Sequence, residues 1–520
     1  MSSNLTLISP DRVLKARDDW APISEAPIIG KDVLELLSSS MYVNVLSVYR
    51  EYVQNAADSI DIANESALLS KRGGRVHLSV DAQRRVARIR DNGVGIRRKD
   101  FVERLVAFGA SKKRGTRARG FRGVGRLAGL GYCQELIFRA KAVDDTHISE
   151  LRWDCRKLKT LIRSEQYSDN LERLVWDVVT ARTFIDGTMP SHFFEVELVG
   201  IVRHGSDVLM DSTAIQKYLE QIAPIPFSPE FSYGAQIEDA LKPHVNLGNV
   251  EITINGGERP LYRPYRDEFE ARKGVRDRFE HLQSLSIPGA DGAVAAVGWI
   301  LHHGYLGAFP KTSPIKGLRL RSGNMQIGEA ELLDEIFPEP RFNSWATGEV
   351  HILDDRILPN GRRDHFEQNV HFRNVLAQLA PFARDLGHLC RNSSIRRNWI
   401  RQFEQGVVFI KDRQAILRQG AITRERRIRV KGEIADRLEV LERIASHSVL
   451  DEATKSAFRR RLQQLNKKLP ALADLRTPHD LKRFRGARRR LILKLVDIVY
   501  DATSNQTAAK ALVDKILRRL

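Results

Sequence analysis

The sequence predicts an α+β protein in three parts, two successive α/β regions followed by a region made only of helices. Up to about residue 200, segments with helical periodicity alternate with short strand-like segments. From about 205 to 385, short strands and helices are separated by many Gly and Pro turns, and after about 386 Gly and Pro become sparse. A chain of 520 residues is also too long for a single hydrophobic core. We therefore place the domains at 1–204, 205–385 and 386–520.

Hydrophobic periodicity predicts the elements of each part. The first part should contain a helix over 31–63, broken near 40–42, and then strands at Val76–Val80, Val86–Arg90 and Glu135–Ala140. A glycine-rich stretch, Gly109 to Gly131, opens into a further helix before the last of these strands. The second part should contain strands at Val250–Ile254, Val294–Trp299, Leu318–Leu320 and Glu349–Leu353. The third part carries two short helical stripes that favour a hairpin or bundle: Ile434, Leu438, Leu441 and Ile444, then Leu462, Leu465 and Leu469.

Composition narrows the class of protein. Hydrophobic residues make up 42% and charged residues 29% of the chain, which is typical of a globular, soluble protein. No apolar run is long enough to span a bilayer, so no membrane association is expected. The N-terminus lacks the basic-then-apolar order of a secretory signal. The three scattered cysteines, Cys133, Cys155 and Cys390, favour buried reduced thiols in a cytoplasmic protein over disulfides or a zinc site.

The net charge of +19 is concentrated in the last quarter of the chain. From Arg391 to the end, 32 Lys and Arg face 14 Asp and Glu, a balance of +18, which leaves +1 for residues 1–390. Six of the nine residues at 482–490 are basic. This distribution favours a polyanion such as nucleic acid as the partner of residues 391–520. A solvated helical face, a membrane surface and an acidic protein are the alternatives.

The helix around SVYREYVQNAADSIDIA carries the first candidate motif. Glu51, Asn55 and Asp58 fall at i, i+4 and i+7, and therefore on one helical face. Taken alone, such a face is more often plain solvated surface. Its significance depends on the motifs that follow it.

Two glycine motifs come next. The strand RVARIR runs into Asp91-Asn92-Gly93-Val94-Gly95, where a carboxylate at a strand end can face a cleft beside closely approaching backbone. A tight turn is the alternative explanation. The later segment, Gly120 to Gly129, is a glycine loop leading into a helix, which can offer N–H groups to phosphates. It is not a Walker A loop, because GxxxxGK[ST] is absent from the sequence.

In this order and spacing, the three motifs resemble the N, G1 and G2 boxes of the GHKL, or Bergerat-fold, ATPases: ExxxNAxD, DxGxG and GxxGxG. YREYVQNAADSID, IRDNGVGI and FGASKKRGTRARGFRGVGRLAG are similar to the corresponding segments of the ninety-kilodalton heat-shock chaperone and MORC-like branch. The resemblance covers roughly residues 25–200. It implies an N-terminal Bergerat ATP-binding α/β sandwich, with ATP and Mg²⁺ as ligands.

The resemblance also implies roles for individual residues. Glu51 would be the general base for the attacking water, and Asn55 would bind Mg²⁺. Asp91 would accept a hydrogen bond from the adenine amino group. The remaining implied nucleotide-binding residues are Asp58, Gly93 and Gly95 beside the base, and Lys112, Gly120, Gly123, Val124 and Gly125 in the lid and phosphate loop. These residue types suit phosphoryl transfer to water, which depends on positioning and charge neutralisation.

The second part carries a further resemblance. LPNGRRDHFEQN is similar to the middle-domain loop of the chaperone in which an arginine reaches the γ-phosphate. This implies a transducer-like domain with Arg363 as the catalytic arginine, and with Asn360 and Glu367 supporting the loop. Arg362 is adjacent and could exchange roles with Arg363. Lys316, in PIKGLRLRSGNMQIG, is a second candidate, because other members of the class use a lysine from this domain.

The predicted function is a Mg²⁺-dependent ATPase that works as a conformational clamp, forming a homodimer and acting on nucleic acid or a partner protein of the same system. Resemblance to uncharacterised bacterial GHKL proteins suggests genome defence or DNA maintenance. A histidine kinase is disfavoured, because no histidine precedes the N box. A chaperone-like ATPase and a nucleic-acid-binding scaffold with a regulatory ATP site are the alternatives.

Overall fold

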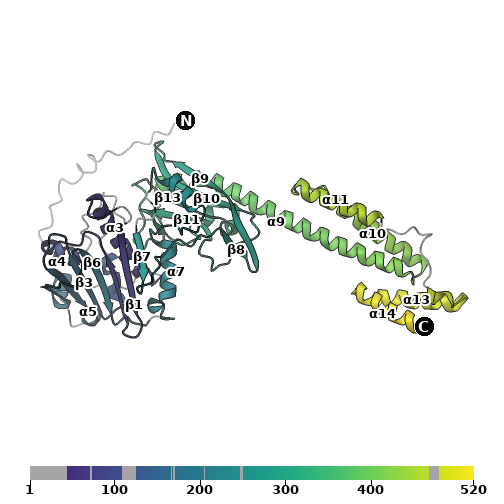
Figure 1. Ribbon diagram of the computed structural model, residues 1–520, viewed down its shortest axis with the longest axis horizontal. Helices are drawn as coiled ribbons and strands as arrows, with labels where there is room; N and C mark the ends of the chain where they lie inside the picture. Colours follow the sequence, from purple (N-terminus) through teal and green to yellow (C-terminus); the bar gives the residue numbers. More distant parts are fainter. Residues whose placement is uncertain are drawn as a thin grey trace, which may run out of the picture.

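The computed structural model describes residues 44–70, 73–107, 125–164, 167, 170–203, 205–245, 247, 250–467 and 479–520. Two β-sheets lie next to each other, and a long helix leads from the second sheet to a group of helices at the C-terminal end (Figure 1). The predicted α+β class is confirmed. No helix in these described ranges is apolar over a length that could cross a membrane.

The first sheet has seven strands in the order β5-β4-β3-β6-β2-β1-β7, antiparallel except for the parallel pair β1 and β7. The strands are β1 (Gly74–Asp81), β2 (Val86–Asp91), β3 (Glu135–Lys141), β4 (Ile148–Asp154), β5 (Val179–Phe184), β6 (Phe193–Val199) and β7 (Val250–Ile254). One face packs against a helical layer: α3 (Ser47–Glu65), α4 (Arg98–Val106), α5 (Cys155–Arg163), α6 (Leu171–Val178) and the 3₁₀ helix η1 (Gly125–Gly131). The predicted strand pair and the strand at 135–140 are thereby confirmed, whereas residues 31–43 of the predicted first helix lie outside the described residues.

The opposite face of the first sheet is covered by an ion-pair network. Arg139 on β3 contacts three carboxylates, at distances of 2.6 to 2.8 Å, from β4 and β6. Its partners are Glu150, Glu195 and Glu197, all buried. Because strand side chains alternate between faces, the intervening residues of β6 point into the apolar core. One face of the sheet therefore packs against the helical layer, and the other face is covered by ion pairs.

The position of β7 differs from the domain division expected from the sequence. Val250–Ile254 was expected in the second part, but it pairs with β1 and extends the first sheet. The 3₁₀ helix η2 (Val208–Met210) and α7 (Ser212–Ile222) also contribute buried residues to the first core. Parallel pairing between strands so far apart in sequence leaves no local signal. Residues 208–225 and 250–261 thus belong to the first packing unit, whereas the residues from Phe227 to Leu241 pack against the second sheet.

The second sheet has six strands in the order β12-β11-β13-β10-β9-β8. They are β8 (Glu268–Arg272), β9 (Val275–Pro288), β10 (Val294–His303), β11 (Gly317–Ser322), β12 (Met325–Ile327) and β13 (Thr347–Ile352). One face packs against α8 (Gly234–Leu241). The other packs against the 3₁₀ helices η3 (Asp334–Ile336) and η4 (Pro340–Trp345) and the first turns of α9 (Val370–Gln419).

Buried polar groups tie the second sheet to the first unit. Arg321 on β11 is 1% exposed and pairs with Glu349 on β13 at 2.7 Å. The same guanidinium donates to the carbonyl of Gln221, near the C-terminus of α7, at 2.6 Å. A cation at a helix C-terminus is favoured by the helix dipole. Since α7 also packs against α3, this contact fixes the second sheet relative to the helix that carries the first motif.

The C-terminal region is built on α9, which has 50 residues and begins with the Asn369 side chain capping the Phe372 N–H. The expected boundary at 385/386 therefore falls inside one continuous helix. Gly and Pro become sparse after this point because the chain is helical there. The helix begins earlier, however, and the first turns of α9 belong to the core of the second sheet. Beyond α9 come α10 (Arg424–Ala445), α11 (Glu452–Lys467), α12 (His479–Lys482), α13 (Gly486–Ala502) and α14 (Gln506–Arg519).

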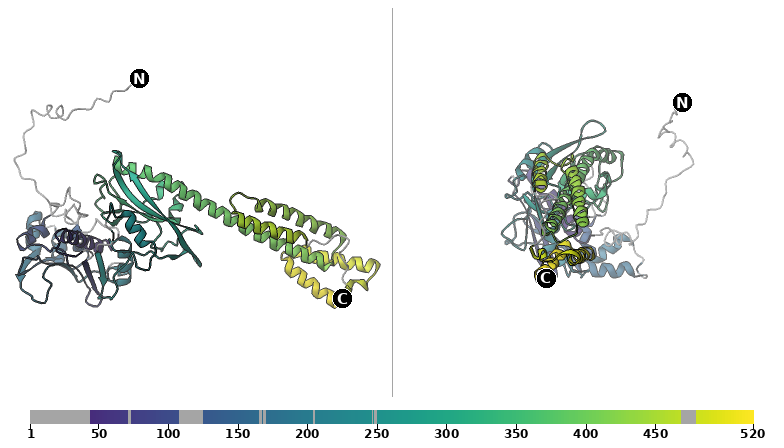
Figure 2. Two further views of the ribbon diagram at one scale, coloured as in Figure 1. Left: turned by 45° about the horizontal axis from the view of Figure 1, so that its top comes forward. Right: turned by 90° about the vertical axis from the view of Figure 1, so that its right-hand side faces the viewer.

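These helices form a separate core at the end of α9 far from the sheets, with α13 and α14 on its outside (Figure 2). The predicted stripe at 434–444 and its neighbours Leu462 and Leu465 are buried in it, while Leu469 lies outside the described residues. Gly406 lets α10 approach α9 closely, since a Cβ there would overlap the side chain of Leu441. The predicted helical bundle is confirmed.

Candidate functional site

Helix α3 carries the first motif on a buried face. Glu51 and Asp58 are each 3% exposed, and Asn55 is half-buried. Their neighbours Val53, Ala57 and Ile60 are fully buried, so the apolar positions of the helix anchor it to the sheet. The solvated-face alternative does not describe this helix. Carboxylates are rarely buried without a partner, so this face must interact with other groups.

Asp91 lies at the end of β2, directly beside α3. It is 4% exposed, and its Oδ1 accepts the Gly93 N–H at 2.9 Å. Burial raises the pKa of Asp91 to about 7, although hydrogen bonds from Gly93 and Ser59 oppose the rise. A buried carboxylate of this kind can accept a hydrogen bond from a ligand without competition from water.

The two glycines after Asp91 are required by close packing. A Cβ at Gly93 would overlap the Ser59 side chain on α3. Gly95 has φ +66° and faces the backbone oxygens of Lys141 and Phe193, so a side chain would be both strained and obstructed. The segment therefore passes between α3 and the ends of β3 and β6 as bare backbone, which is the form of approach that a flat ligand needs.

The described end of the glycine loop meets the first motif. Gly125 begins η1, and a Cβ there would overlap the Glu51 carboxylate. Four residues later, the Gly129 N–H donates to the Tyr52 hydroxyl at 2.9 Å. The predicted contacts Lys112, Gly120, Gly123 and Val124 lie outside the described residues. The part of the loop that is described thus rests directly on α3.

Arg363 reaches this site from the second unit, on the loop that follows β13. Its Nε lies 3.0 Å from Glu51 Oε1, and its Nη1 donates to Gln54 Oε1. Its own carbonyl accepts from Arg50 Nη2 at 3.0 Å and from the Gly328 N–H at 3.0 Å. Arg363 has φ +56°, a conformation that non-glycine residues rarely adopt and that is held here by these contacts.

The other residues predicted in the second part lie elsewhere. Lys316 pairs with Glu331 on its own domain, and its side chain is largely buried there. Arg362 points to solvent beside Arg363. Asn360 stabilises the loop, because its Nδ2 donates to Asp364 Oδ1 at 2.6 Å. The Glu367 N–H donates to the Leu358 carbonyl at 2.8 Å, which closes the same loop.

Sequence reasoning missed the residues that hold these groups in place. Gln54 is 1% exposed and Arg50 6% exposed, and both contact Arg363. Ser59 lies four residues after Asn55 and packs against the Asp91 segment. The periodicity of α3 places Ser59 near the motif face, so its proximity could have been found. The contacts of Arg50 and Gln54 depend on docking of the second unit, and no local signal indicates it.

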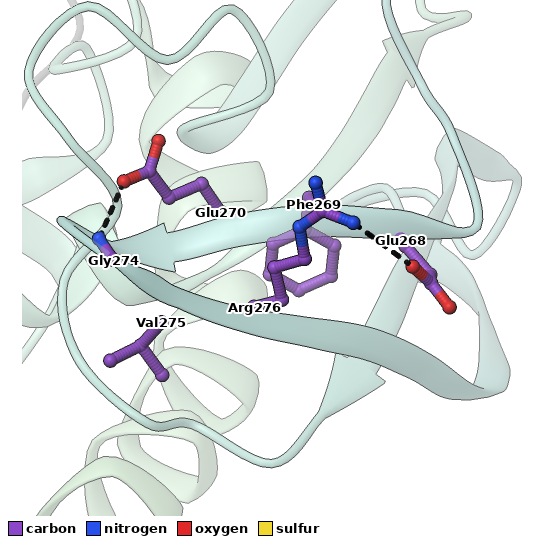
Figure 3. Close-up of a pocket in the computed structure, with 6 residues that line it drawn as sticks. All are labelled: Glu268, Phe269, Glu270, Gly274, Val275 and Arg276. Atoms are coloured by element: carbon purple, nitrogen blue, oxygen red, sulfur yellow. Dashed lines mark hydrogen bonds and ion pairs between the residues drawn. The ribbon is translucent and has the colours of Figure 1, made fainter.

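A pocket of about 550 Å³ lies elsewhere, on the β8–β9 hairpin of the second sheet (Figure 3). It is lined by Glu268, Phe269, Glu270, Gly274, Val275 and Arg276. Arg276 reaches toward Glu268 across the hairpin at 4.0 Å, and the Gly274 N–H donates to Glu270 at 2.8 Å. None of the residues predicted from the three motifs lines it. Its charged side chains already have partners within the hairpin, so the pocket offers no argument for a ligand.

In the described part of the chain, no cluster of three or more His, Cys, Asp or Glu could hold a metal ion. A metal at the α3 site would therefore need oxygen ligands from a bound nucleotide as well as Asn55. Magnesium typically binds in this way, through few protein oxygens together with substrate phosphates.

Comparison with known proteins agrees with this geometry. Residues 43–175 match the family described as histidine kinase-, DNA gyrase B- and HSP90-like ATPase. The chain is 34% identical to the chaperone protein HtpG of Helicobacter acinonychis over 16% of this chain and 14% of the relative. It is 28% identical to HtpG of a Helicobacter pylori strain over 22% and 21% of the two chains, and 37% identical to that of Serratia proteamaculans over 17% and 15%.

These similarities are confined to one region, and the chain matches about a fifth or less of the length of these relatives. The matched region contains α3, Asp91 with its glycines, and Gly125, which are the elements that the structure brings together. Residues 43–175 therefore carry a domain of the histidine kinase-, DNA gyrase B- and HSP90-like ATPase type, as the three boxes predicted.

Proposed function

We propose that this protein binds ATP between α3 and the Asp91 segment and hydrolyses it with Glu51 and Arg363. The observation that carries the proposal is the 3.0 Å ion pair between these two residues, which joins the first unit to the second. A general base and a cation that meet at one point are the groups needed to deprotonate water and to neutralise charge on a phosphoryl group. Gly125 packs on the same carboxylate, which brings the end of the phosphate loop there too.

The residues around this point suit a nucleotide. Asp91 is a buried acceptor for the adenine amino group, and Gly93 and Gly95 leave backbone where a side chain would intrude. Asn55 and Asp58 lie on the same face of α3 and would hold Mg²⁺ and its surroundings. Bound Mg²⁺ would neutralise phosphate charge and orient the phosphates. Lys112, Gly120, Gly123 and Val124 would complete the phosphate contacts.

In the proposed reaction, Glu51 accepts a proton from water as the water attacks the terminal phosphate. Arg363 stabilises the negative charge that is transferred to the leaving oxygens. Gln54 binds the guanidinium of Arg363 and Arg50 binds its backbone carbonyl, so Arg363 and Glu51 are both positioned before the reaction begins. Because Arg363 belongs to the second unit, any movement between the units changes the catalytic site. Hydrolysis and domain movement are therefore coupled, as in a conformational clamp.

The test of this proposal is the substitution Arg363→Ala. We expect turnover to fall on the order of 10²-fold, the usual loss for one preorganised donor. ATP affinity should change little, because the guanidinium acts mainly on the transition state. Phosphate release and calorimetric ATP titration measure the two quantities. Arg362→Ala, at the exposed neighbouring position, is the matched control, and Lys316→Ala tests the other basic candidate.

Equal loss of affinity and turnover in Arg363→Ala would contradict this role. So would an effect confined to Lys316→Ala, which would assign the phosphate contact to that lysine.

Contact with nucleic acid through residues 391–520 is a second candidate function. The observation that favours it is the exposure of basic side chains on α10 and α13, among them Arg424, Arg429, Arg488 and Arg490. An extended basic surface of this kind binds phosphate backbones without sequence preference, and it could serve genome defence or DNA maintenance.

We expect the full chain to bind duplex DNA or RNA with an affinity that falls steeply with salt. Anisotropy titrations from low to physiological salt measure this. Absence of binding at tens of micromolar, roughly the range of non-specific binders, would leave a protein partner or chaperone-like client as the better explanation of the charge.

A further inference from the structure

Arg126 is a cation of the first unit that lacks an anionic partner in the described part of the chain. It is the second residue of η1, and its Nη2 donates to the Ala107 carbonyl at the C-terminal end of α4. Its Nε is shielded from solvent and has no hydrogen-bond partner. No carboxylate of the described residues pairs with this guanidinium. Burial of an unpaired charge is unfavourable, so the surroundings of Arg126 are incomplete without an anion.

The neighbouring charge makes this position less favourable still. Burial, and then repulsion by Arg104 on the exposed side of α4, lowers the pKa of Arg126 to about 10. The guanidinium therefore remains charged at neutral pH. The Ala107 carbonyl supplies only a partial negative charge, so it leaves the positive charge of Arg126 uncompensated.

Capping of α4 is the simpler explanation of the contact with Ala107. A cation near the C-terminus of a helix is favoured by the helix dipole. An exposed side chain gives the same benefit, however, and α4 already has Arg104 in its last turn. Capping therefore accounts for the hydrogen bond to Ala107 but leaves the buried Nε of Arg126 unexplained.

The position of Arg126 indicates which anion it meets. It follows Gly125, where a Cβ would overlap the Glu51 carboxylate. Helix α4, whose end it contacts, begins three residues after Gly95 and has nine residues, which span about 13 Å. Arg126 thus lies where the end of the glycine loop meets the helix that follows the Asp91 segment. A nucleotide with its base at Asp91 and its terminal phosphate at Glu51 carries its other phosphates between these two points.

We propose that the Arg126 guanidinium binds a non-terminal phosphate of the nucleotide, one that ATP and ADP share. This inference rests on the nucleotide site proposed above. The planar donors of an arginine match the oxygens of a phosphate, and charge-assisted hydrogen bonds of this kind are strong. Arg363 acts on the terminal phosphate from the second unit, whereas Arg126 belongs to the same unit as Asp91. Its contact with the nucleotide is therefore independent of how the second unit docks.

Calorimetric titration of a nucleotide series with the full chain tests the proposal. Arg126→Met keeps the length of the side chain and removes its charge and its donors. The affinities for ATP and for ADP should each fall about 10- to 100-fold, the loss expected for one hydrogen bond between charged groups. The affinity for adenosine should stay unchanged, because adenosine has no phosphate. kcat at saturating ATP should change little, since the ground state and the transition state lose the same contact.

Two further variants serve as controls. Arg104→Met removes the same charge from the exposed side of α4, where solvent screens it, so ATP affinity should change by less than about threefold. Arg126→Lys keeps the charge but not the planar donors, and it should recover part of the affinity for ADP.

The same titrations would overturn the proposal in three cases. Unchanged ATP and ADP affinity in Arg126→Met would exclude a phosphate contact while leaving the ATP site intact. An equal loss of adenosine affinity, with a lower melting temperature of the nucleotide-free variant, would make Arg126 a structural cap of α4. A loss for ATP but not for ADP would assign the guanidinium to the terminal phosphate. Failure of the unchanged chain to bind ATP would instead contradict the nucleotide site itself, and the role of Arg126 with it.

Discussion

Helices α3 and α13 depart from the usual arrangement of a helix in opposite ways. α3 buries charge, with Glu51 and Asp58 each 3% exposed, whereas α13 leaves three aliphatic residues more than half exposed. A buried carboxylate and an exposed apolar stripe are each unfavourable for an isolated fold. The buried charge of α3 is explained if the helix is completed by groups outside its own packing unit, namely Arg363 together with the proposed nucleotide. The stripe on α13, formed by Leu491, Leu495 and Ile498, has no such partner in the described bundle.

The comparison also separates a face with directional contacts from one without them. The buried face of α3 is held by directional contacts, such as the 3.0 Å pair between Glu51 and Arg363, and it should tolerate almost no change. The exposed face of α13 is non-directional and should tolerate any aliphatic side chain. The following predictions test whether the two helices are independent and whether α3 has the proposed role.

The largest effect is expected for Glu51→Ala. Removal of a general base typically costs on the order of 10²–10⁴ in rate. ATP should still bind, because Asp91 and the glycine loop remain. Phosphate release gives the rate and calorimetry the affinity. Glu65→Ala, an exposed acid at the end of the same helix, is the control. Turnover of Glu51→Ala within about twofold of the unchanged chain, far short of that cost, would remove Glu51 from the mechanism.

A smaller effect is expected for Asp91→Asn. The substitution replaces a charged acceptor with an amide that can present a donor to the adenine amino group. Hydrogen bonds to charged groups contribute about 1.5–3 kcal/mol, so ATP affinity should fall roughly 10- to 100-fold. Unchanged affinity by calorimetry would show that Asp91 does not contact the base.

The independence of the two helices predicts a null result. Leu495→Glu should change the ATP affinity of each chain by less than about twofold. α13 lies outside the nucleotide site, and a substitution weakens ATP binding only when it removes a contact with ATP. If Leu495→Glu abolished ATP binding, the two helices would not be independent.

The sequence predicted the local parts of this arrangement better than the distant ones. Glu51, Asn55 and Asp58 could be placed on one face because helical periodicity is local, and the DNG turn could be placed at a strand end for the same reason. The meeting of Arg363 with Glu51 was suggested only by resemblance, because it depends on how two packing units dock. The contacts of Arg50 and Gln54 with Arg363 were missed for that reason.

Two larger features of the structure also could not be predicted from local sequence patterns. β7 joins the first sheet by parallel pairing with β1, more than 170 residues away in sequence, and periodicity carries no such information. On α13, the sequence indicated a basic segment that turns apolar. Which apolar residues face the bundle and which stay exposed depends on the packing of α13 against its neighbours in the bundle.

The last expected effect concerns the stability of the first unit without nucleotide, through Asp91. Its pKa is about 7 in the folded chain, above the ordinary value of 3.8, because burial disfavours the charged form. Between these two values the folded state binds the extra proton, so the stability of the first unit should fall as pH rises from about 4 to 7 and level off above. Asp91→Asn removes this dependence. Between pH 5 and 7 the unchanged chain should lose about 2–3 kcal/mol relative to Asp91→Asn, at 1.36 kcal/mol per pKa unit.

Calorimetric melting of the transition that ATP shifts would measure this difference as a few degrees. ATP should have the opposite pH dependence, because only the ionised carboxylate is the strong acceptor. Affinity should therefore rise through pH 7 in the unchanged chain and stay flat in Asp91→Asn. If melting of the two chains ran parallel from pH 5 to 8, the Asp91 carboxylate would be ionised throughout, and its burial beside α3 would not carry the expected energetic cost.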